Sequence, residues 1–214
     1  MTRPRVSPWA SACLGALLLA PAAADATSFK TTPLDLVDLL QQSELILRGR
    51  VASVSDGIDA RGVPFTEVTL QVAEVLKGQA GKAYTFRQFG LLKPRPVGNG
   101  RVNLMVTPSA WATWVPGEES IVFLRTPARW TGLQTTAGLA QGQFKVSVGG
   151  ALNALGNSGL FRQVAVDPLL LGDREKRVLA TQQGAVNAEG FTALVRQAVE
   201  GKWVETGRMR HADR

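Results

Sequence analysis

ELILRGRVASVS (residues 44–55) and FTEVTLQVAEVL (residues 65–76) are the two stretches that decide the fold of this chain. In both, apolar and polar residues alternate, which is the pattern of a β-strand whose two faces meet different surroundings. The segment between them, SDGIDARG, contains an Asp-Gly and an Arg-Gly pair that are typical of a turn. The two stretches therefore predict a long β-hairpin.

Further strands follow this hairpin along the chain. The alternation changes phase near Glu74, which predicts a bulge that bends the second strand, as closed barrels require. Residues 90–100 form a loop rich in Pro and Gly. ESIVFLR (residues 119–125) is almost wholly apolar and predicts a buried central strand. Three other short strands are expected, at residues 82–89, 133–137 and 143–148.

Helices are expected before and after these strands in the sequence. The first covers residues 32–42, with Thr32 as its N-cap, and Asp35 and Asp38 suit the positive end of its dipole. Residues 149–159 read as a flexible loop, and residues 173–183 as a short helix or turn. The last helix is amphipathic and covers residues 188–200, beyond which the tail is expected to fray.

These elements predict a mainly β protein: a small OB-like β-barrel with an N-terminal and a C-terminal helix. The expected organisation is a signal peptide over residues 1–26, the barrel over 27–150, and a C-terminal extension over 151–214 whose helix packs on the barrel. We expect a monomer.

The N-terminus has the features of a secretory leader. Arg3 and Arg5 precede the apolar run WASACLGALLLA (residues 9–20), and Ala24-Asp25-Ala26 supplies a cleavage site. We expect cleavage after Ala26, with the preceding alanine triplet as the alternative. The run is shorter than the roughly 20 residues that cross a bilayer, and no later stretch is long and apolar enough. A retained N-terminal anchor is the other interpretation. The sequence therefore predicts export to the periplasm or beyond the cell.

The composition of the chain expected after loss of the leader limits the kinds of site and partner that it can have. Cys13 is the only cysteine and lies in the leader, which excludes disulfides and thiolate sites from the mature chain. The formal charge is +7, and loss of the leader leaves 22 basic and 16 acidic residues, a charge of +6. Outside the cytoplasm such a surface favours anionic polysaccharide, lipid head groups or acidic proteins over nucleic acid. The alternative is a surplus of arginine with no partner.

Residues 36–78 and the later segments WVPGEESIVFLR (114–125) and GLAQGQFKV (138–146) carry a family resemblance. They resemble uncharacterised bacterial secreted domains and, more distantly, the netrin-like module, the OB-type barrel of the tissue inhibitors of metalloproteinases. The resemblance covers residues 34–148 and implies a barrel. Those inhibitors chelate the protease zinc through an N-terminal cysteine, whereas the expected mature chain begins Thr27-Ser28-Phe29.

A search for catalytic groups finds no constellation typical of an enzyme. The one histidine, His211, lies in the tail, where a catalytic histidine would lack support. Zinc needs three or four ligands, which one histidine and no cysteine do not supply. Asp56 and Asp59 lack the spacing of a calcium loop and suit an ordinary turn. We therefore expect a protein that is not an enzyme and that needs no cofactor or metal.

The candidate binding residues are Trp111, Trp114, Arg95 and Arg101. Tryptophans near arginines can form an aromatic and basic patch, as OB folds often use; the alternative is that both tryptophans pack over an open barrel end. The leading hypothesis is an exported, non-enzymatic module that binds a protein or an anionic glycan. The alternatives are a metalloprotease-inhibitor-like protein and a carboxylate-based hydrolase of glycans, which needs two carboxyl groups in one cleft.

Overall fold

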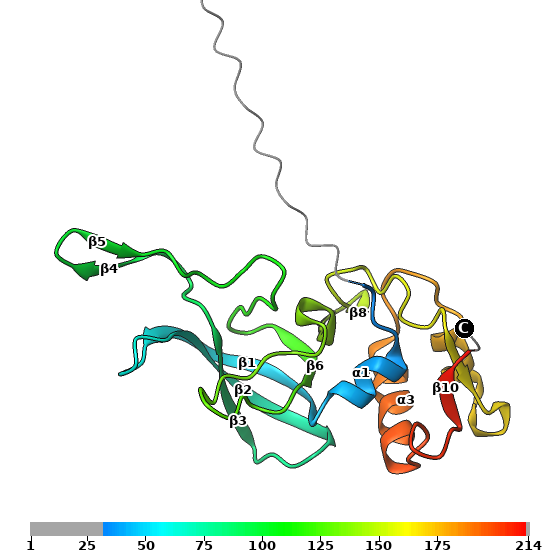
Figure 1. Ribbon diagram of the computed structural model, residues 1–214. Coiled ribbons are helices and arrows are strands. Elements are labelled where there is room, and N and C mark those ends of the chain that lie inside the picture. Colours follow the sequence, from blue (N-terminus) through cyan, green and yellow to red (C-terminus); the bar gives the residue numbers. More distant parts are fainter. Residues whose placement is uncertain (1–31, 213–214) are drawn as a thin grey trace, which may run out of the picture. The chain divides into compact units, whose positions relative to one another are not determined.

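The computed structural model describes residues 32–212, and its largest element is a six-stranded antiparallel sheet (Figure 1). The leader, its cleavage site and Cys13 lie outside the described residues. The strand order is β3-β2-β1-β6-β7-β8. The strands are β1 (Leu45–Ile58), β2 (Pro64–Lys77), β3 (Ala83–Phe89), β6 (Glu119–Leu124), β7 (Gln143–Ser147) and β8 (Gly150–Leu152).

The β1–β2 hairpin is the longest pairing in the sheet and confirms the prediction from its alternating sequence. Its register shifts where Ile46 faces Lys77 but Leu47 faces Val75, and again where Arg48 faces Glu74. The phase change near Glu74 is thus a pair of bulges, which increase twist and bend the ribbon.

The sheet is open, so the predicted closed barrel is wrong. The expected strand at residues 133–137 is absent. Thr136 makes an isolated bridge to Leu124, and the Gln134 amide donates to the Arg87 carbonyl of β3 at 2.7 Å. These contacts link the end of β6 to β3 without forming a further strand of the sheet.

Helices cover one face of the sheet. The helix α1 (Leu36–Gln42) begins at Asp35, not at Thr32, because Asp35 and Asp38 form a reciprocal capping box. The helix α3 (Ala188–Glu200) has the bounds that its amphipathic pattern predicts. Phe191 of α3 packs against Phe123 and Phe144 of the sheet, with the latter ring centroids 4.8 Å apart. A second apolar cluster, which includes Leu47, lies on the other face.

The segment after β8 is more structured than its sequence suggests. The expected loop over residues 149–159 contains β8 and the buried Asn157, whose side-chain amide donates to the carbonyls of Ala151 and Gly184. The chain then forms β9 (Val164–Val166), the short helix α2 (Asp173–Leu179) and β10 (Met209–His211). A 3₁₀ turn, η2 (Pro168–Leu170), lies between β9 and α2. A second 3₁₀ turn, η1 (Leu139–Gly142), comes earlier in the chain, directly before β7.

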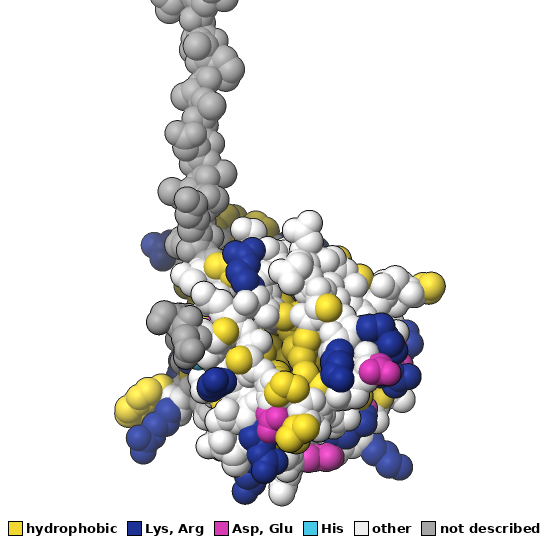
Figure 2. Space-filling view, turned by 90° about the vertical axis from the view of Figure 1, so that its right-hand side faces the viewer, with side chains coloured by type: hydrophobic (Ala, Val, Ile, Leu, Met, Phe, Trp, Pro, Cys, Tyr) yellow, Lys and Arg dark blue, Asp and Glu magenta, His cyan; other side chains and the backbone are white. Residues whose placement is uncertain are grey.

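The C-terminal tail is not frayed, which corrects the expectation from its charged sequence. β10 pairs with β9 in a separate two-stranded ladder, and Met209 is fully buried. The face that carries this ladder and the helices is hollowed, with hydrophobic side chains in the hollow and Lys and Arg around it (Figure 2). In the described part of the chain, no helix has both the length and the apolar character needed to cross a membrane.

Candidate functional site

Trp114 lies in the core beneath the sheet. Its exposed fraction is 7%, its ring meets Phe86 edge to face at 5.3 Å, and its Nε1–H donates to Gln88 Oε1 at 2.9 Å. Every polar and apolar part of the indole therefore has a partner inside the protein. Trp114 stabilises the fold and is not presented to a ligand.

Trp111 is half-buried beside Phe89, with ring centroids 6.3 Å apart. It lines a cleft of about 340 Å³ together with polar side chains such as Gln143 and Lys145. Gln143 is already engaged, because its side-chain amide exchanges hydrogen bonds with the main chain of Thr113. Trp111 and Trp114 thus lie in different environments and do not form one aromatic platform.

Arg95 and Arg101 lie together on a hairpin that sequence reasoning missed. β4 (Arg95–Gly98) and β5 (Arg101–Asn103) pair with each other and extend away from the six-stranded sheet (Figure 1). We call residues 92–106, which include this hairpin, the arm. The signal was Asn99-Gly100: both residues have positive φ, 49° and 70°, as a two-residue hairpin turn of type I′ requires.

The arm has a fixed base. Leu91 is fully buried, its amide donates to the Met105 carbonyl, and its carbonyl accepts from the Thr107 amide, both at 2.9 Å. Gly90 allows this approach, because a Cβ there would lie 2.5 Å from the Thr107 main chain. Thr107 therefore packs directly on the end of β3, and the arm begins immediately beyond this contact.

Asp56 of β1 ties the arm to the long hairpin. Its carboxylate accepts from the Leu92 amide at 2.8 Å and pairs with the Arg95 guanidinium. Arg95 also reaches the Asp56 carbonyl at 3.2 Å. Arg95 is thereby an anchor of the arm, whereas Arg101 remains exposed on the other strand.

The arm exposes a concentration of apolar side chains. Leu104 is 71% exposed, although a leucine normally gains stability from burial. It has five exposed apolar neighbours on the same arm: Leu92, Val97, Val102, Met105 and Val106. Isolated exposed apolar residues are ordinary on protein surfaces, whereas six on one short segment are unusual.

The sequence segment that carries the arm contains charged residues of one sign only. Residues 75–117 contain six basic side chains and no acidic one. Arg87 pairs with Glu67, and Arg95 with Asp56. Within residues 32–212, Lys93 and Arg101 have no ion-pair partner. The arm therefore combines exposed apolar groups with uncompensated positive charge.

A second exposed apolar residue lies at the end of the same long hairpin. Trp130 is 87% exposed, and Arg61, in the turn between β1 and β2, donates to its carbonyl at 2.6 Å. Asp59 orients Arg61 through a contact of 3.0 Å. The Val63 amide, which donates to Asp59, is the main cause that lowers the pKa of this carboxyl below its ordinary value, with Arg61 contributing.

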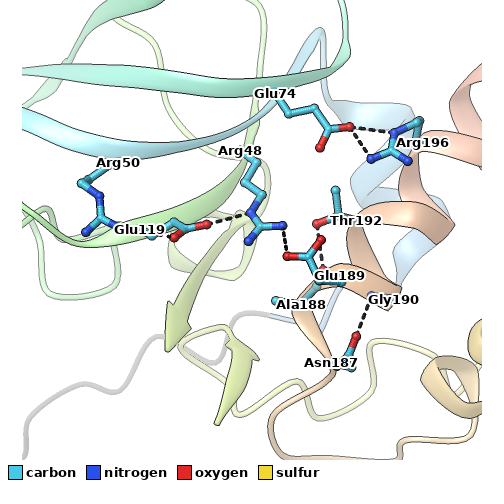
Figure 3. Close-up of polar contacts among 10 residues, drawn as sticks. All are labelled: Arg48, Arg50, Glu74, Glu119, Asn187, Ala188, Glu189, Gly190, Thr192 and Arg196. Carbon is cyan, nitrogen blue, oxygen red and sulfur yellow. Dashed lines mark hydrogen bonds and ion pairs between the residues drawn. The ribbon is translucent and has the colours of Figure 1, made fainter. Parts of the chain in front are cut away.

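Half-buried and exposed charges join the sheet to α3 (Figure 3). Arg48 of β1 contacts Glu119 of β6 at 2.7 Å and Glu189 of α3 at 2.5 Å. Arg196 of α3 pairs with Glu74 of β2. Burial disfavours the charged Arg48, but the two carboxylates outweigh it and raise the pKa of the guanidinium. These charges are mutually satisfied and hold α3 in place.

His211 lies in a supported position, contrary to the expectation of a frayed tail. Its Nδ1 is 2.8 Å from Oδ2 of Asp35, which is 5% exposed, and its Nε2 is 3.6 Å from Oδ1 of Asp38. Each carboxylate also accepts a main-chain N–H of the capping box. Both ring nitrogens face carboxylates, so the imidazole fastens β10 to α1.

In the described part of the chain, these three residues also lie close enough together to hold a metal ion, with one ligand atom from each within 4.8 Å of the others. The capping box and the imidazole already account for these carboxylates. Sequence reasoning missed the cluster because Asp35 and His211 are 176 residues apart.

No protein-family model matches this chain, and no curated protein matches it. The resemblance to the netrin-like module therefore stays a prediction. The inhibitor hypothesis depends on the N-terminus, which lies outside the described residues.

Proposed function

We propose that this chain is an exported, non-enzymatic binding module and that the arm is the element that contacts its partner. The observation that carries the proposal is the cluster of six exposed apolar side chains on the arm. A solvent-exposed cluster of this kind costs solubility unless a partner covers it. The arm replaces the tryptophan pair as the candidate site, while Arg95 and Arg101 stay within it.

The build of the arm supports this role. Its base is held by the buried Leu91 and by Asp56, so the contact surface is presented by a rigid scaffold. Pre-organised elements lose less conformational entropy on binding than flexible ones. A flexible linker would have no need of a paired hairpin, a type I′ turn and an internal ion pair.

The side chains of the arm indicate which chemical class of partner would bind it. An anionic glycan would satisfy Lys93 and Arg101 but would leave most of the apolar side chains uncovered. A partner that offers both an apolar region and negative charge covers both parts of the surface. We therefore place the partner in that class.

The non-enzymatic part of the proposal rests on the state of the reactive groups. The Nδ1 atom of His211 contacts Asp35 at 2.8 Å, its Nε2 atom faces Asp38 at 3.6 Å, and both carboxylates are engaged in capping α1. Neither carboxylate is free to act as an acid or a nucleophile on a bound sugar.

Retention on the cell envelope tests the role of the arm. The chain is produced in its own host with a C-terminal tag, either unchanged or with Leu104→Ser and Met105→Ser together. The matched control carries Val148→Ser and Leu169→Ser, which remove two even more exposed apolar side chains elsewhere on the surface. We expect the arm variant to be released into the soluble fraction and the control to behave as the unchanged chain. Equal retention of all three proteins would overturn the proposal.

A further inference from the structure

We infer that the partner of the arm is the surface of an anionic lipid bilayer, an inference that rests on the proposed function. The arm would lie along the interface, with its apolar side chains among the upper acyl chains and its basic groups among the phosphates. Such interfacial binding combines buried apolar area with attraction to anionic head groups.

The distribution of the apolar groups favours lipid over a protein partner. Leu104, Met105 and Val106 follow one another in sequence, and all three are exposed. Consecutive side chains of a non-helical segment point in different directions, so the chain has no covered side there. A protein surface covers one face of a hairpin, whereas lipid surrounds whatever enters it.

The backbone of the arm suits a shallow position. β4 and β5 pair through Arg95–Asn103 and Pro96–Val102, but within the described residues the outer main-chain groups of this two-stranded hairpin have no neighbouring strand. Unpaired N–H and C=O groups would be costly in the hydrocarbon region. The turn itself, Asn99-Gly100, is polar and is followed by Arg101. The tip is therefore expected to stay at head-group depth, with the arm lying flat and not inserted end-on.

The charges agree with this orientation. Lys93 stands at the base of the arm and Arg101 at its tip, so positive groups occur at both ends of the apolar cluster. Residues 75–117 contain no acidic side chain that would repel phosphates. Each such cation contributes to binding an anionic bilayer, and its contribution falls as salt rises.

Trp130 supplies an additional interfacial group. It is exposed beside the β1–β2 turn, and Asp56 of the same hairpin holds the arm. Tryptophan is enriched at membrane–water interfaces because its ring is apolar and its N–H is polar. Both exposed apolar elements are thus anchored to the end of one hairpin.

Co-sedimentation with vesicles tests the inference. The protein is purified after export, so every variant shares the same N-terminus, and it is mixed with vesicles of phosphatidylcholine with or without one-third phosphatidylglycerol. We expect binding to the anionic vesicles only, and weaker binding in high salt. The Leu104→Ser, Met105→Ser variant should lose about tenfold or more in affinity. The Lys93→Gln, Arg101→Gln variant should lose about fivefold for each charge.

Two controls separate the arm from the rest of the surface. Val148→Ser with Leu169→Ser removes exposed apolar groups elsewhere, and Lys176→Gln with Arg208→Gln removes the same charge elsewhere. Both should bind as the unchanged protein does. No binding of the unchanged protein to anionic vesicles, or losses that the controls share, would overturn the inference.

A fluorescent label reports the depth of the arm directly. Cys13 is the only cysteine of the chain, so a Leu104→Cys variant of the processed protein accepts one environment-sensitive fluorophore. Anionic vesicles should shift its emission to the blue, whereas the same label at Val148→Cys should not respond. A label at position 104 that stays water-like while the protein sediments with vesicles would overturn the assigned contact.

The failures of the two proposals are distinguishable. A photo-crosslinker at position 104, introduced in living cells, that attaches to a protein and not to lipid would refute the lipid inference while leaving the arm as the contact element. If arm variants keep their envelope retention, the proposed function fails as well.

Discussion

The arm and the helix-covered face of the sheet are both rich in apolar residues, but the residues of the face are buried and those of the arm are exposed to solvent. On the helix-covered face, Ile121, Phe123 and Phe144 are fully buried by α1 and α3. On the arm, residues of similar hydropathy face solvent, and Leu104 is the most exposed of them. The first region shows what the fold needs in order to be stable. The second shows surface that folding leaves uncovered and that a partner outside the chain would cover.

The largest expected effect of a substitution lies on the helix-covered face. Phe191 contacts three other phenylalanines, Phe123, Phe144 and Phe161. Phe191→Ala should lower the free energy of unfolding by about 3–5 kcal/mol, because it removes a large buried side chain and leaves a cavity. Urea denaturation followed by circular dichroism measures this. A loss below about 1 kcal/mol would mean that the two regions differ less than their burial indicates.

The next effect concerns the fastening of the C-terminus to α1. His211→Ala should cost about 1–3 kcal/mol, because the buried Asp35 carboxylate loses a charged or polar partner. Arg210→Ala, one residue earlier on the exposed side of β10, is the matched control and should cost little. If both variants unfold at the same urea concentration, the imidazole does not hold the strand.

A smaller effect is expected for the ion pairs between α3 and the sheet. Glu189→Gln removes one partner of Arg48, but the Glu189 side chain is 64% exposed, so the cost should be about 0.2–1 kcal/mol. The loss should shrink in high salt. Glu200→Gln, in the last turn of the same helix, gives the baseline. A cost above that of His211→Ala would show that this ion pair stabilises the fold more than the imidazole does, contrary to its exposure.

The effect at Asp59 is smaller still and depends on pH. Its pKa is lower in the folded protein than the ordinary 3.8, so its contribution is complete above that pH and is lost as the pH falls through the folded-state value. Asp59→Asn should therefore lower the stability slightly near neutrality, and the difference from the unchanged chain should disappear in acid, so that the decline of stability in acid becomes flatter. Unfolding curves recorded from neutral pH downward would show this. An unchanged slope in acid would contradict it.

The smallest effect on stability is expected on the arm, and it sharpens the comparison most. Leu104→Ser with Met105→Ser should change the free energy of unfolding by no more than about 0.5 kcal/mol, because the side chains are already in water. The same variant is expected to abolish retention on the envelope. Destabilisation on the scale of Phe191→Ala would show that these residues belong to the core.

The sequence predicts well those strands and helices that have a periodic pattern of apolar residues. The strands at residues 44–55 and 65–76 and the helix at 188–200 follow from alternation and from helical periodicity, which are local properties. The bulge near Glu74 was visible as a change of phase. The β4–β5 hairpin was predictable in principle from Asn99-Gly100, but the surrounding prolines and glycines favoured a loop.

The candidate site was only partly accessible from sequence. Arg95 and Arg101 were identified, but their roles differ because Asp56, on another strand, binds one and not the other. Trp114 and Leu104 are both apolar residues near turns, and no local pattern shows that the first is buried and the second exposed.

Local sequence thus determined the long β1–β2 hairpin, the strand β6 and the helix α3, and the charge and apolar content of every segment. Tertiary structure alone decided that the sheet stays open, that Asp35 meets His211 across 176 residues, and that the arm is left uncovered. The physical reason is that periodicity records backbone geometry within a few residues, whereas burial depends on which distant segments come together.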